Sequence, residues 1–397
     1  MSKNPTLFTS LRAFPPVVWI LFFGTFLNKF GSFVIPFLAI YLTSKGYTYV
    51  QAGVAIGAYG AGNVLATILG GYLADHLGRR KTIVLSMFSG AASMILLSQA
   101  NSYPVILLFA ALAGLASEFY RPASSALLAD LVPAGERVTA YSAYRMFINA
   151  GFAFGPATAG FIAGHGFFWL FAGDAGTSVL FGIVALVALP EVAHPPGDRA
   201  GWVDSARTLA ADRRLHRVLL GAFGIALIFC QMTCTFGLAT THAGLSTKTY
   251  GFLLSMNGVL VVLFELPLTT ITRRLRPMAV IAFGYLVVAV GFGLTAFAQS
   301  IGGFVACVTL FTLGEMLAMP VASAYVAGLS PNNMRGRYMG CYGLTWTLAT
   351  VVGPALGLSL FGVSPTGFWL VSGLLGLASA AVAFEGRGPG LPAPSLP

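Results

Sequence analysis

Twelve long apolar stretches, separated by short polar or glycine-rich ones, make up almost the whole of this 397-residue sequence. Each is close to or longer than the roughly 20 residues that an α-helix needs to cross a bilayer. A segment inside the hydrocarbon must satisfy its own backbone hydrogen bonds, so each stretch is predicted to be helical. The pattern therefore predicts an all-α polytopic membrane protein. The predicted spans are 17–43, 50–74, 82–99, 103–131, 138–164, 168–190, 216–243, 250–271, 277–298, 302–329, 336–361 and 366–385.

Composition agrees with this pattern. Hydrophobic residues make up 57% and charged residues 9%, whereas soluble domains carry about 25% charged residues. The net charge of +10 could indicate nucleic acid, but the bases gather on one side of the predicted membrane. Loops on the Met1 side hold 17 Lys and Arg, and the opposite loops hold only Lys45 and Lys248. By the positive-inside rule both termini are expected in the cytoplasm, and no nucleic-acid partner is predicted.

The one long polar stretch runs from Glu191 to Leu215 and separates two groups of six spans. We expect an N-terminal six-helix bundle at 1–190, a cytoplasmic linker at 191–215 and a C-terminal six-helix bundle at 216–397. Part of the linker, residues 202–209, has the pattern of a short amphipathic helix at the membrane surface.

The two halves repeat at an offset of 198 residues without a gap across spans 4–5 and 10–11. Pro122 pairs with Pro320, Arg137 pairs with Arg335, and the Gly155-Pro156-Ala157 run pairs with an identical run in the second half. Chance similarity of two apolar segments would not place prolines and a loop arginine at one fixed offset. The repeat predicts two pseudo-symmetric bundles related by an axis along the membrane normal.

The loop after span 2 reads Gly71-Tyr72-Leu73-Ala74-Asp75-His76-Leu77-Gly78-Arg79-Arg80-Lys81. It resembles the loop 2–3 signature of the major facilitator superfamily, G-x-L-A-D-x-x-G-R-R/K. With the span count and the repeat, the resemblance covers essentially the whole chain and implies a twelve-span secondary transporter. It also implies a cytoplasmic latch in which Asp75, Arg79 and Asp130 bridge to span 11 and hold the outward-facing state. For Lys81, membrane topology alone is a sufficient explanation.

Span 5 contains Gly151-Phe152-Ala153-Phe154-Gly155-Pro156-Ala157-Thr158-Ala159-Gly160. This run resembles the G-x-x-x-G-P-x-x-G-G motif of facilitator-family antiporters, with alanine at the second-last glycine. Small residues let helices approach closely, and proline permits a bend, so generic packing is the alternative explanation. In the family the motif accompanies export. The residues assigned to conformational gating are Gly71, Asp75, Gly78, Arg79, Arg80, Asp130, Gly151, Gly155 and Pro156.

Seven ionisable residues lie within predicted spans, where each charge costs about 2.5–3.5 kcal/mol at the bilayer centre on insertion scales. Glu118 and Arg121 are three positions apart on one helix and face the same way. They are either a self-neutralising pair or a proton switch, in which departure of the arginine favours protonation of the glutamate. The proton-coupling candidates are Glu118, Glu315, Arg121, Asp174 and Glu265.

Glu315 has no Lys or Arg within one helical turn in the sequence, so we expect its carboxyl to tend toward the protonated form. It is the leading single candidate for the proton carrier, ahead of Asp174 and Glu265. Lys29 lies in mid-span 1, where many exporters of the resembled family carry a carboxylate. It either neutralises a buried acid or receives an anionic group of the substrate, and the sequence leaves both open.

Spans 1, 4, 7 and 10 line the central cavity in the resembled fold. Their aromatic, methionine and single amide groups suit bulky amphipathic ligands, because flexible surfaces repack around varied shapes. The substrate-binding candidates are Asn28, Lys29, Phe33, Tyr59, Asn63, Gln231, Thr235, Asn257, Met316 and Met319.

These observations predict a proton-coupled antiporter that exports amphipathic drugs or small molecules by alternating access. The alternatives are a symporter or uniporter that imports a sugar, organic anion or other nutrient, and a non-transporting sensor or scaffold. No nucleotide, catalytic-triad or zinc signature is present, so an enzyme, a cofactor and a metal site are not predicted. The expected partners are a small-molecule substrate, protons and the lipid bilayer. The expected form is a monomer in the bacterial inner membrane.

Overall fold

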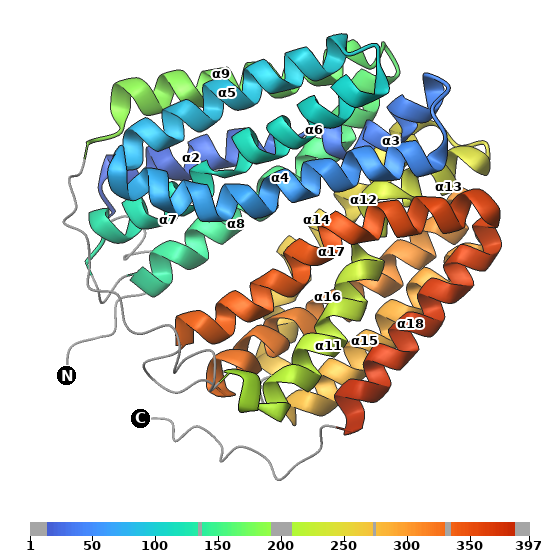
Figure 1. The fold of residues 1–397 in the computed structure, drawn as a ribbon. Coiled ribbons are helices and arrows are strands. Elements are labelled where there is room, and N and C mark those ends of the chain that lie inside the picture. The colour runs from blue at the N-terminus through green and yellow to red at the C-terminus, as the bar shows by residue number, and fades with distance from the viewer. Residues whose placement is uncertain (1–13, 134–136, 192–208, 273–274, 330–334, 386–397) are drawn as a thin grey trace. The chain divides into compact units, whose positions relative to one another are not determined.

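The computed structural model describes residues 14–133, 137–191, 209–272, 275–329 and 335–385 (Figure 1). Within these ranges the regular elements are helices, and twelve spans are long and apolar enough to cross a membrane, which confirms the predicted fold class. The helices are α2 (Pro16–Phe30), α3 (Val34–Ser44), α4 (Tyr49–His76), α5 (Arg79–Gln99), α6 (Tyr103–Glu118), α7 (Tyr120–Leu131), α8 (Arg137–Ala163), α9 (Phe168–Ala188), α11 (Arg213–Phe229), α12 (Gln231–Cys234), α13 (Phe236–His242), α14 (Thr247–Thr272), α15 (Pro277–Leu294), η2 (Thr295–Phe297), α16 (Ile301–Leu329), α17 (Arg335–Val363) and α18 (Pro365–Glu385).

Contacts divide the chain into two compact units. The first consists of Met1–Gly197 together with Thr247–Val259, and the second of Asp198–Ser246 together with Leu260–Pro397. The helix α14 therefore begins in one unit and ends in the other. Most of the predicted linker, including nearly all of the amphipathic helix expected at 202–209, lies outside the described residues. The predicted domain boundaries stay a prediction.

Three spans are interrupted helices. Span 1 is α2 followed by α3, span 4 is α6 followed by α7, and span 7 is α11, α12 and α13 in sequence (Figure 1). Hydropathy predicts each of these as one uninterrupted stretch, because an interruption of one to three residues hardly changes the apolar pattern. Backbone groups and side chains at such breaks can contact ligands and ions.

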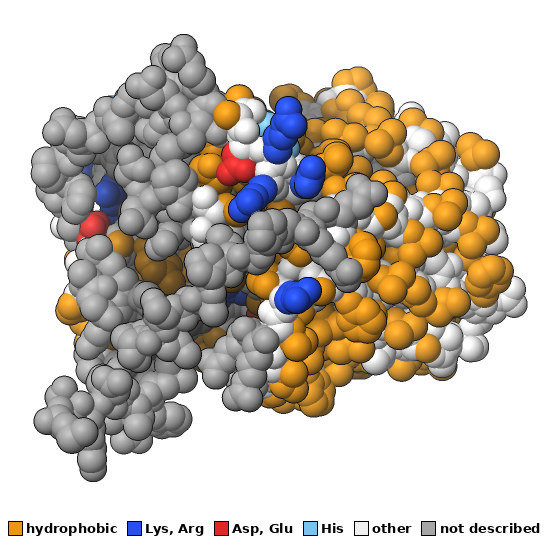
Figure 2. Space-filling view, turned by 90° about the horizontal axis from the view of Figure 1, so that it is seen from below, with side chains coloured by type: hydrophobic (Ala, Val, Ile, Leu, Met, Phe, Trp, Pro, Cys, Tyr) orange, Lys and Arg blue, Asp and Glu red, His pale blue; other side chains and the backbone are white. Residues whose placement is uncertain are grey.

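Each unit has an aromatic core. In the first, the Phe22 ring stacks on Phe147 with centroids 5.4 Å apart, and in the second, Phe292 stacks on Phe311 at 4.5 Å. Large apolar side chains are also widely exposed, as expected for helices that face lipid. Figure 2 shows them over much of the described surface, with several Lys and Arg side chains near the centre of that view and another toward its left edge.

Glycines allow close helix packing where α15 meets α16. A Cβ on Gly314 would lie 2.6 Å from the amide nitrogen of Val288, and a Cβ on Gly284 would lie 2.9 Å from that of Ala318. These backbones approach so closely that neither position accepts a side chain.

Candidate functional site

An ion cluster lies inside the first unit. One carboxylate oxygen of Glu118, Oε1, is 2.6 Å from Lys29 Nζ, and the other, Oε2, is 3.3 Å from a guanidinium nitrogen of Arg121. The Lys29 side chain is 5% exposed and that of Glu118 is 16% exposed, whereas Arg121 is 58% exposed. One acid is thus shared between a buried cation and an accessible one. Of the two roles left open for Lys29, this geometry is that of a cation neutralising a buried acid.

The break in span 4 places Glu118 at the last residue of α6. The hydroxyl of Ser86, from α5, donates to the Ala116 carbonyl at 2.5 Å and accepts from the Tyr120 amide at 3.1 Å. In an uninterrupted helix that amide would bond directly to that carbonyl, four residues earlier. The Ser86 hydroxyl is inserted between them, which is a recognised cause of a helix kink. The Ser86 hydroxyl thus lies at the point where α6 ends and α7 begins.

The break in span 1 lies next to the other member of the ion pair. Lys29 is in the last turn of α2, where a cation interacts favourably with the helix dipole. After the break, the amide of Val34 at the start of α3 lies 3.5 Å from a carboxylate oxygen of Asp174 on α9. Asp174 is 6% exposed. This buried acid is in contact with the start of α3, a position where anions are favoured.

The small residues of span 5 lie against this same part of span 1. A Cβ on Gly151 would lie 2.8 Å from Lys29 Cβ, and one on Gly155 would lie 2.5 Å from the Phe30 carbonyl oxygen. Pro156 lies within α8, and the next amide, that of Ala157, donates to the Ser255 hydroxyl of α14 at 2.8 Å. The span 5 motif therefore contacts the segment that carries Lys29.

The loop between α4 and α5 holds the first unit together at one end. The Arg79 guanidinium donates to the Ala74 carbonyl at 2.7 Å and lies 3.5 Å from Asp130 on α7. Arg80 donates to the Leu186 carbonyl near the end of α9. Gly78, which precedes the first residue of α5, has a φ of +92°, a backbone conformation that glycine readily adopts.

Two other gating candidates at this loop are not tested by these contacts. The side chain of Asp75 lies outside the described residues. At Gly71 a Cβ would meet nothing within 4 Å, so no close helix approach requires this glycine. The proposed bridge from this loop to span 11 stays a prediction.

Sequence reasoning missed a role for Lys81. Its ammonium forms an exposed ion pair with Glu191 at 2.8 Å. The hydrogen bond and charge of Lys81 lower the pKa of the Glu191 carboxyl below its ordinary value. Glu191 follows α9, the sixth span, so this pair connects the loop between α4 and α5 to the beginning of the predicted linker.

The remaining candidates of the first unit are mostly held in packing contacts. Asn28 donates weakly to Ser178 at 3.5 Å, and Phe33 packs edge-on against Phe30 with centroids 5.5 Å apart. Tyr59 is 9% exposed, and its backbone packs against Gly114. Asn63 is half-buried, and its side-chain oxygen has no hydrogen-bond partner among the described groups. The half-buried Asn257, on α14, also belongs to this unit.

In the second unit, Gln231 and Thr235 form a buried polar link. The Gln231 amide donates to the Gly353 carbonyl at 2.9 Å, and its oxygen accepts from the Thr235 hydroxyl at 2.7 Å. This link lies at the interruptions of span 7 and connects it to α17. The other candidates of this unit are Glu265 on α14 and Glu315, Met316 and Met319 on α16, of which Met316 is buried and the other three are half-buried.

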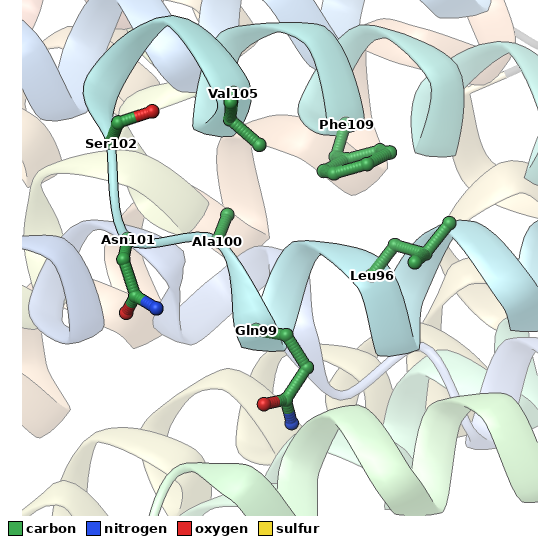
Figure 3. Close-up of a pocket in the computed structure, with 7 residues that line it drawn as sticks. All are labelled: Leu96, Gln99, Ala100, Asn101, Ser102, Val105 and Phe109. Carbon is green, nitrogen blue, oxygen red and sulfur yellow. The ribbon is translucent and has the colours of Figure 1, made fainter.

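A surface hollow lies at the turn between α5 and α6 (Figure 3), and no residue of the ion cluster lines it. It has a volume of about 330 Å³ and is lined by Leu96, Gln99, Ala100, Asn101, Ser102, Val105 and Phe109. None of these side chains titrates near neutral pH, so this hollow does not offer the chemistry of a proton-coupled site.

The ion cluster could be anticipated from the sequence only in part. The spacing of Glu118 and Arg121 indicates their contact, but Lys29 is 89 positions from Glu118, and no local pattern identifies that partner. Ser86 is one of many serines in apolar spans, and nothing in its neighbourhood distinguishes it.

Comparisons with known proteins agree with this architecture. The family model described as Major Facilitator Superfamily matches residues 21–245 and 234–395. The uncharacterized MFS-type transporter YqjV of Bacillus subtilis (strain 168) is 28% identical over 394 residues, covering 93% of this chain and 94% of the relative. A Na(+), Li(+), K(+)/H(+) antiporter of Planococcus maritimus is 24% identical and covers 83% of this chain and 85% of the relative.

The quinolone resistance protein NorA of Staphylococcus aureus is 27% identical over 183 residues, which cover 45% of this chain and 47% of the relative. Among solved structures, the inward-facing bacterial homolog of the human lysosomal transporter Spinster aligns with a TM-score of 0.77 at 13% identity. That alignment covers 93% of this chain and 96% of the other. At this identity the structural likeness concerns the fold alone.

Proposed function

This chain belongs to the Major Facilitator Superfamily of membrane transporters, and on that premise we propose that it is a proton-coupled antiporter that exports amphipathic small molecules. The observation that carries the proposal is the sharing of Glu118 between buried Lys29 at 2.6 Å and exposed Arg121 at 3.3 Å. A single carboxylate with two cationic partners holds both while it is ionised and releases both when it is protonated.

Proton coupling follows from the cost of charge in the membrane interior. A buried ion pair that loses one charge leaves the other uncompensated, and removing one partner of a buried pair typically costs about 3–5 kcal/mol. Protonation of Glu118 therefore favours an arrangement in which Lys29 and Arg121 find other partners or water. In alternating access, that arrangement is the inward-facing state, and release of the proton inside drives the return.

Antiport requires the proton and the substrate to compete for one group. A substrate that hydrogen-bonds to the ionised Glu118 meets this condition, because protonation removes the carboxylate that it needs. The glycine contacts of span 5 with Lys29 and Phe30 support this assignment, since the antiporter-like motif lies directly on the ion cluster. Similarity to a cation/proton antiporter and to a quinolone resistance protein supports the same direction of transport.

The driving force is sufficient. One pH unit supplies about 1.4 kcal/mol per proton, and a potential of about 100 mV adds about 2.3 kcal/mol per charge. A neutral substrate exchanged for one proton could then be concentrated a few hundred-fold. No cofactor is needed for such exchange.

The test compares Glu118→Gln with the wild type in proteoliposomes, with ethidium and a fluorescent quinolone as probes. We expect the variant to lose uptake driven by a pH gradient and most of its substrate–substrate counterflow, because glutamine imitates the protonated carboxyl, to which the substrate does not bind. Full pH-driven uptake in Glu118→Gln would remove this residue from the coupling mechanism.

Glu191→Gln is the matched control, because it also removes one acid of an ion pair but does so outside the spans. The pKa of Glu191 is lowered by Lys81, so its pair is complete above the ordinary pKa of a glutamate. The pair is lost only as the pH falls through that lowered value. We therefore expect the pH profile of transport near neutrality to be the same in Glu191→Gln and in the wild type.

A proton-coupled importer of an organic anion is the second candidate. With Glu118 ionised, its cluster with Lys29 and Arg121 carries one net positive charge, which favours an anionic group of the substrate. Such a substrate would bind better when Glu118 is protonated, so proton and substrate would move together. The direction of proton movement during uptake separates the two candidates, since symport acidifies the vesicle interior and antiport makes it more alkaline.

We further propose that Glu315, Asp174 and Glu265 contribute to proton coupling, with Glu315 as the first to test by Glu315→Gln in the same assay. The proposed location is the bacterial inner membrane, with both termini in the cytoplasm.

A further inference from the structure

Four buried hydroxyl groups lie on the three helices α2, α7 and α8 of the first unit. They belong to Thr25 on α2, Tyr120 and Ser124 on α7, and Tyr144 on α8, and each residue is at most 5% exposed. In the part of the chain that the structure describes, the oxygens of Tyr120 and Ser124 have no hydrogen-bond partner, and the hydroxyls of Thr25 and Tyr144 have none beyond each other. The hydroxyls of Thr25 and Tyr144 are close neighbours.

The two tyrosines lie among apolar side chains. Tyr120 and Tyr144 belong to the same buried hydrophobic cluster, with Phe22 and Phe181 among its members. The Tyr120 ring meets Phe181 edge-on at 6.2 Å between centroids, and the Tyr144 ring lies 6.4 Å from Phe22. Buried hydroxyls without a protein partner are ordinarily satisfied by internal water.

The charged groups that face the two tyrosines are few. Tyr120 interacts with Glu118 and Arg121, and Tyr144 interacts with Arg121 and Lys29. The ammonium of Lys29 also lies 5.6 Å from the centre of the Tyr120 ring. Between them, the two tyrosines therefore lie near the shared carboxylate and both of its cations.

Their positions define a direction. On α7, Tyr120 and Ser124 follow Glu118 toward Asp130, which lies about 15 Å from Tyr120 along the helix. Asp130 contacts Arg79 at the loop between α4 and α5, called the basic loop below. Thr25 lies one turn before Lys29 on α2, and Tyr144 lies two turns after the start of α8. The hydroxyls thus occupy the stretch of the unit between Glu118 and the end that carries the basic loop.

We propose that these four hydroxyls hold a chain of internal water that carries protons between Glu118 and the basic-loop end of the first unit. The inference rests on the proposed function, because it takes Glu118 as the proton site. Each hydroxyl or water accepts a proton on one side and donates its own on the other, so no covalent bond to carbon changes and no charge is left behind. Substrate can reach the exposed Arg121, while protons use the buried side.

The experiment follows protonation of Glu118 in the full-length protein in lipid nanodiscs. The infrared carbonyl band of the protonated Glu118 is assigned by its absence in Glu118→Gln, and its growth is timed after a rapid drop in pH. We expect Tyr120→Phe and Tyr144→Phe to slow this growth by about tenfold or more, as loss of a positioned proton-transfer group does. The pH midpoint of the band should stay unchanged, because a proton path changes the rate of protonation but not its equilibrium.

Tyr285→Phe is the matched control, since it removes the hydroxyl of a buried tyrosine in the second unit, and it should keep the wild-type rate. Wild-type rates in both Tyr120→Phe and Tyr144→Phe would overturn the proposal. A shift of the midpoint that accounts for the slower rate would also overturn it, because the hydroxyls would then act on the charge of Glu118.

A second measurement needs no variant. Radiolytic hydroxyl labelling modifies buried side chains that lie next to bound water, so we expect labelling of Tyr120 and Tyr144 in the wild type and much less of Tyr285. Absence of label on both would overturn the proposal. If instead the wild type shows no Glu118 band at any pH, the proposed function itself fails, which separates the two outcomes.

Discussion

At the scale of single residues, Lys29 is the side chain on which the ion cluster depends most. It is 5% exposed and 2.6 Å from Glu118, so its removal leaves a carboxylate buried with one remaining partner, the exposed Arg121. A buried cation in a span is costly unless it is paired. Pairing explains how this position tolerates a lysine.

Lys29→Gln should lower the free energy of unfolding by about 3 kcal/mol, near the lower end of the range for a broken buried pair because Arg121 still contacts Glu118. The Lys29→Gln, Glu118→Gln double variant should recover much of that loss, since neither charge remains unpaired. Thermal unfolding in detergent measures both. If the double variant is no more stable than Lys29→Gln, the pair is not the source of the effect.

The residue scale also shows how far sequence reasoning extends. It selects Glu118, Arg121 and Lys29 because charges within spans are rare and conspicuous. It does not select Tyr120, Tyr144 or Ser86, because hydroxyl side chains are common in membrane helices. Their importance depends on whether another group lies within hydrogen-bond distance, which only the structure shows. Contacts between residues far apart in sequence are set by packing, which a local pattern does not encode.

At the scale of elements, the interruptions of spans 1, 4 and 7 are the features that the apolar pattern missed. Each has a side chain that takes part in its hydrogen bonding: Asp174 contacts the Val34 amide, Ser86 bridges Ala116 and Tyr120, and Gln231 bonds to Gly353. Hydropathy reports whether a residue prefers lipid, and it is insensitive to a single redirected amide. Hydropathy therefore predicts the number and positions of the spans, because these depend on many apolar residues. It does not predict the breaks, because each break depends on a few hydrogen bonds.

Ser86→Ala should close the break in span 4. The Tyr120 amide would then bond directly to the Ala116 carbonyl, so both backbone groups keep a partner and the stability should change by no more than about 1 kcal/mol. Ser86→Thr keeps the hydroxyl and should stay close to the wild type. Distances between spin labels on α6 and α7 measure the angle of the break, and the same distances in Ser86→Ala as in the wild type would contradict this role.

Gly155→Ala and Gly71→Ala form a matched pair of helix substitutions. A Cβ at Gly155 would meet the Phe30 carbonyl oxygen at 2.5 Å, whereas one at Gly71 would meet nothing within 4 Å. We expect Gly155→Ala to force span 5 away from span 1 and to lower transport strongly. Gly71→Ala should keep transport and gain up to about 1 kcal/mol from helix propensity. Equal transport in the two variants would argue against a close-packing role for the span 5 motif.

At the scale of the whole molecule, the asymmetry of basic residues predicts which end of the protein faces the cytoplasm. Impermeant thiol labelling of single cysteines tests it, with Arg80→Cys in the basic loop and Lys45→Cys in the opposite loop, both in a background without the four native cysteines. We expect label on the second alone in intact cells, and on both after the membrane is opened. Label on Arg80→Cys in intact cells would reverse the proposed orientation.

The helix α14 crosses from one unit into the other. Its first half packs on the first unit through the Tyr250 hydroxyl, which donates to the Pro36 carbonyl at 3.0 Å, and through the Ser255 contact with Ala157. A gene divided at the central linker would therefore produce an amino-terminal fragment that lacks thirteen residues of its own fold. Co-expressed fragments should therefore reassemble poorly when cut there, and a cut after Val259 should do no better, because it removes Asp198–Ser246 from the fragment that carries the rest of the second unit.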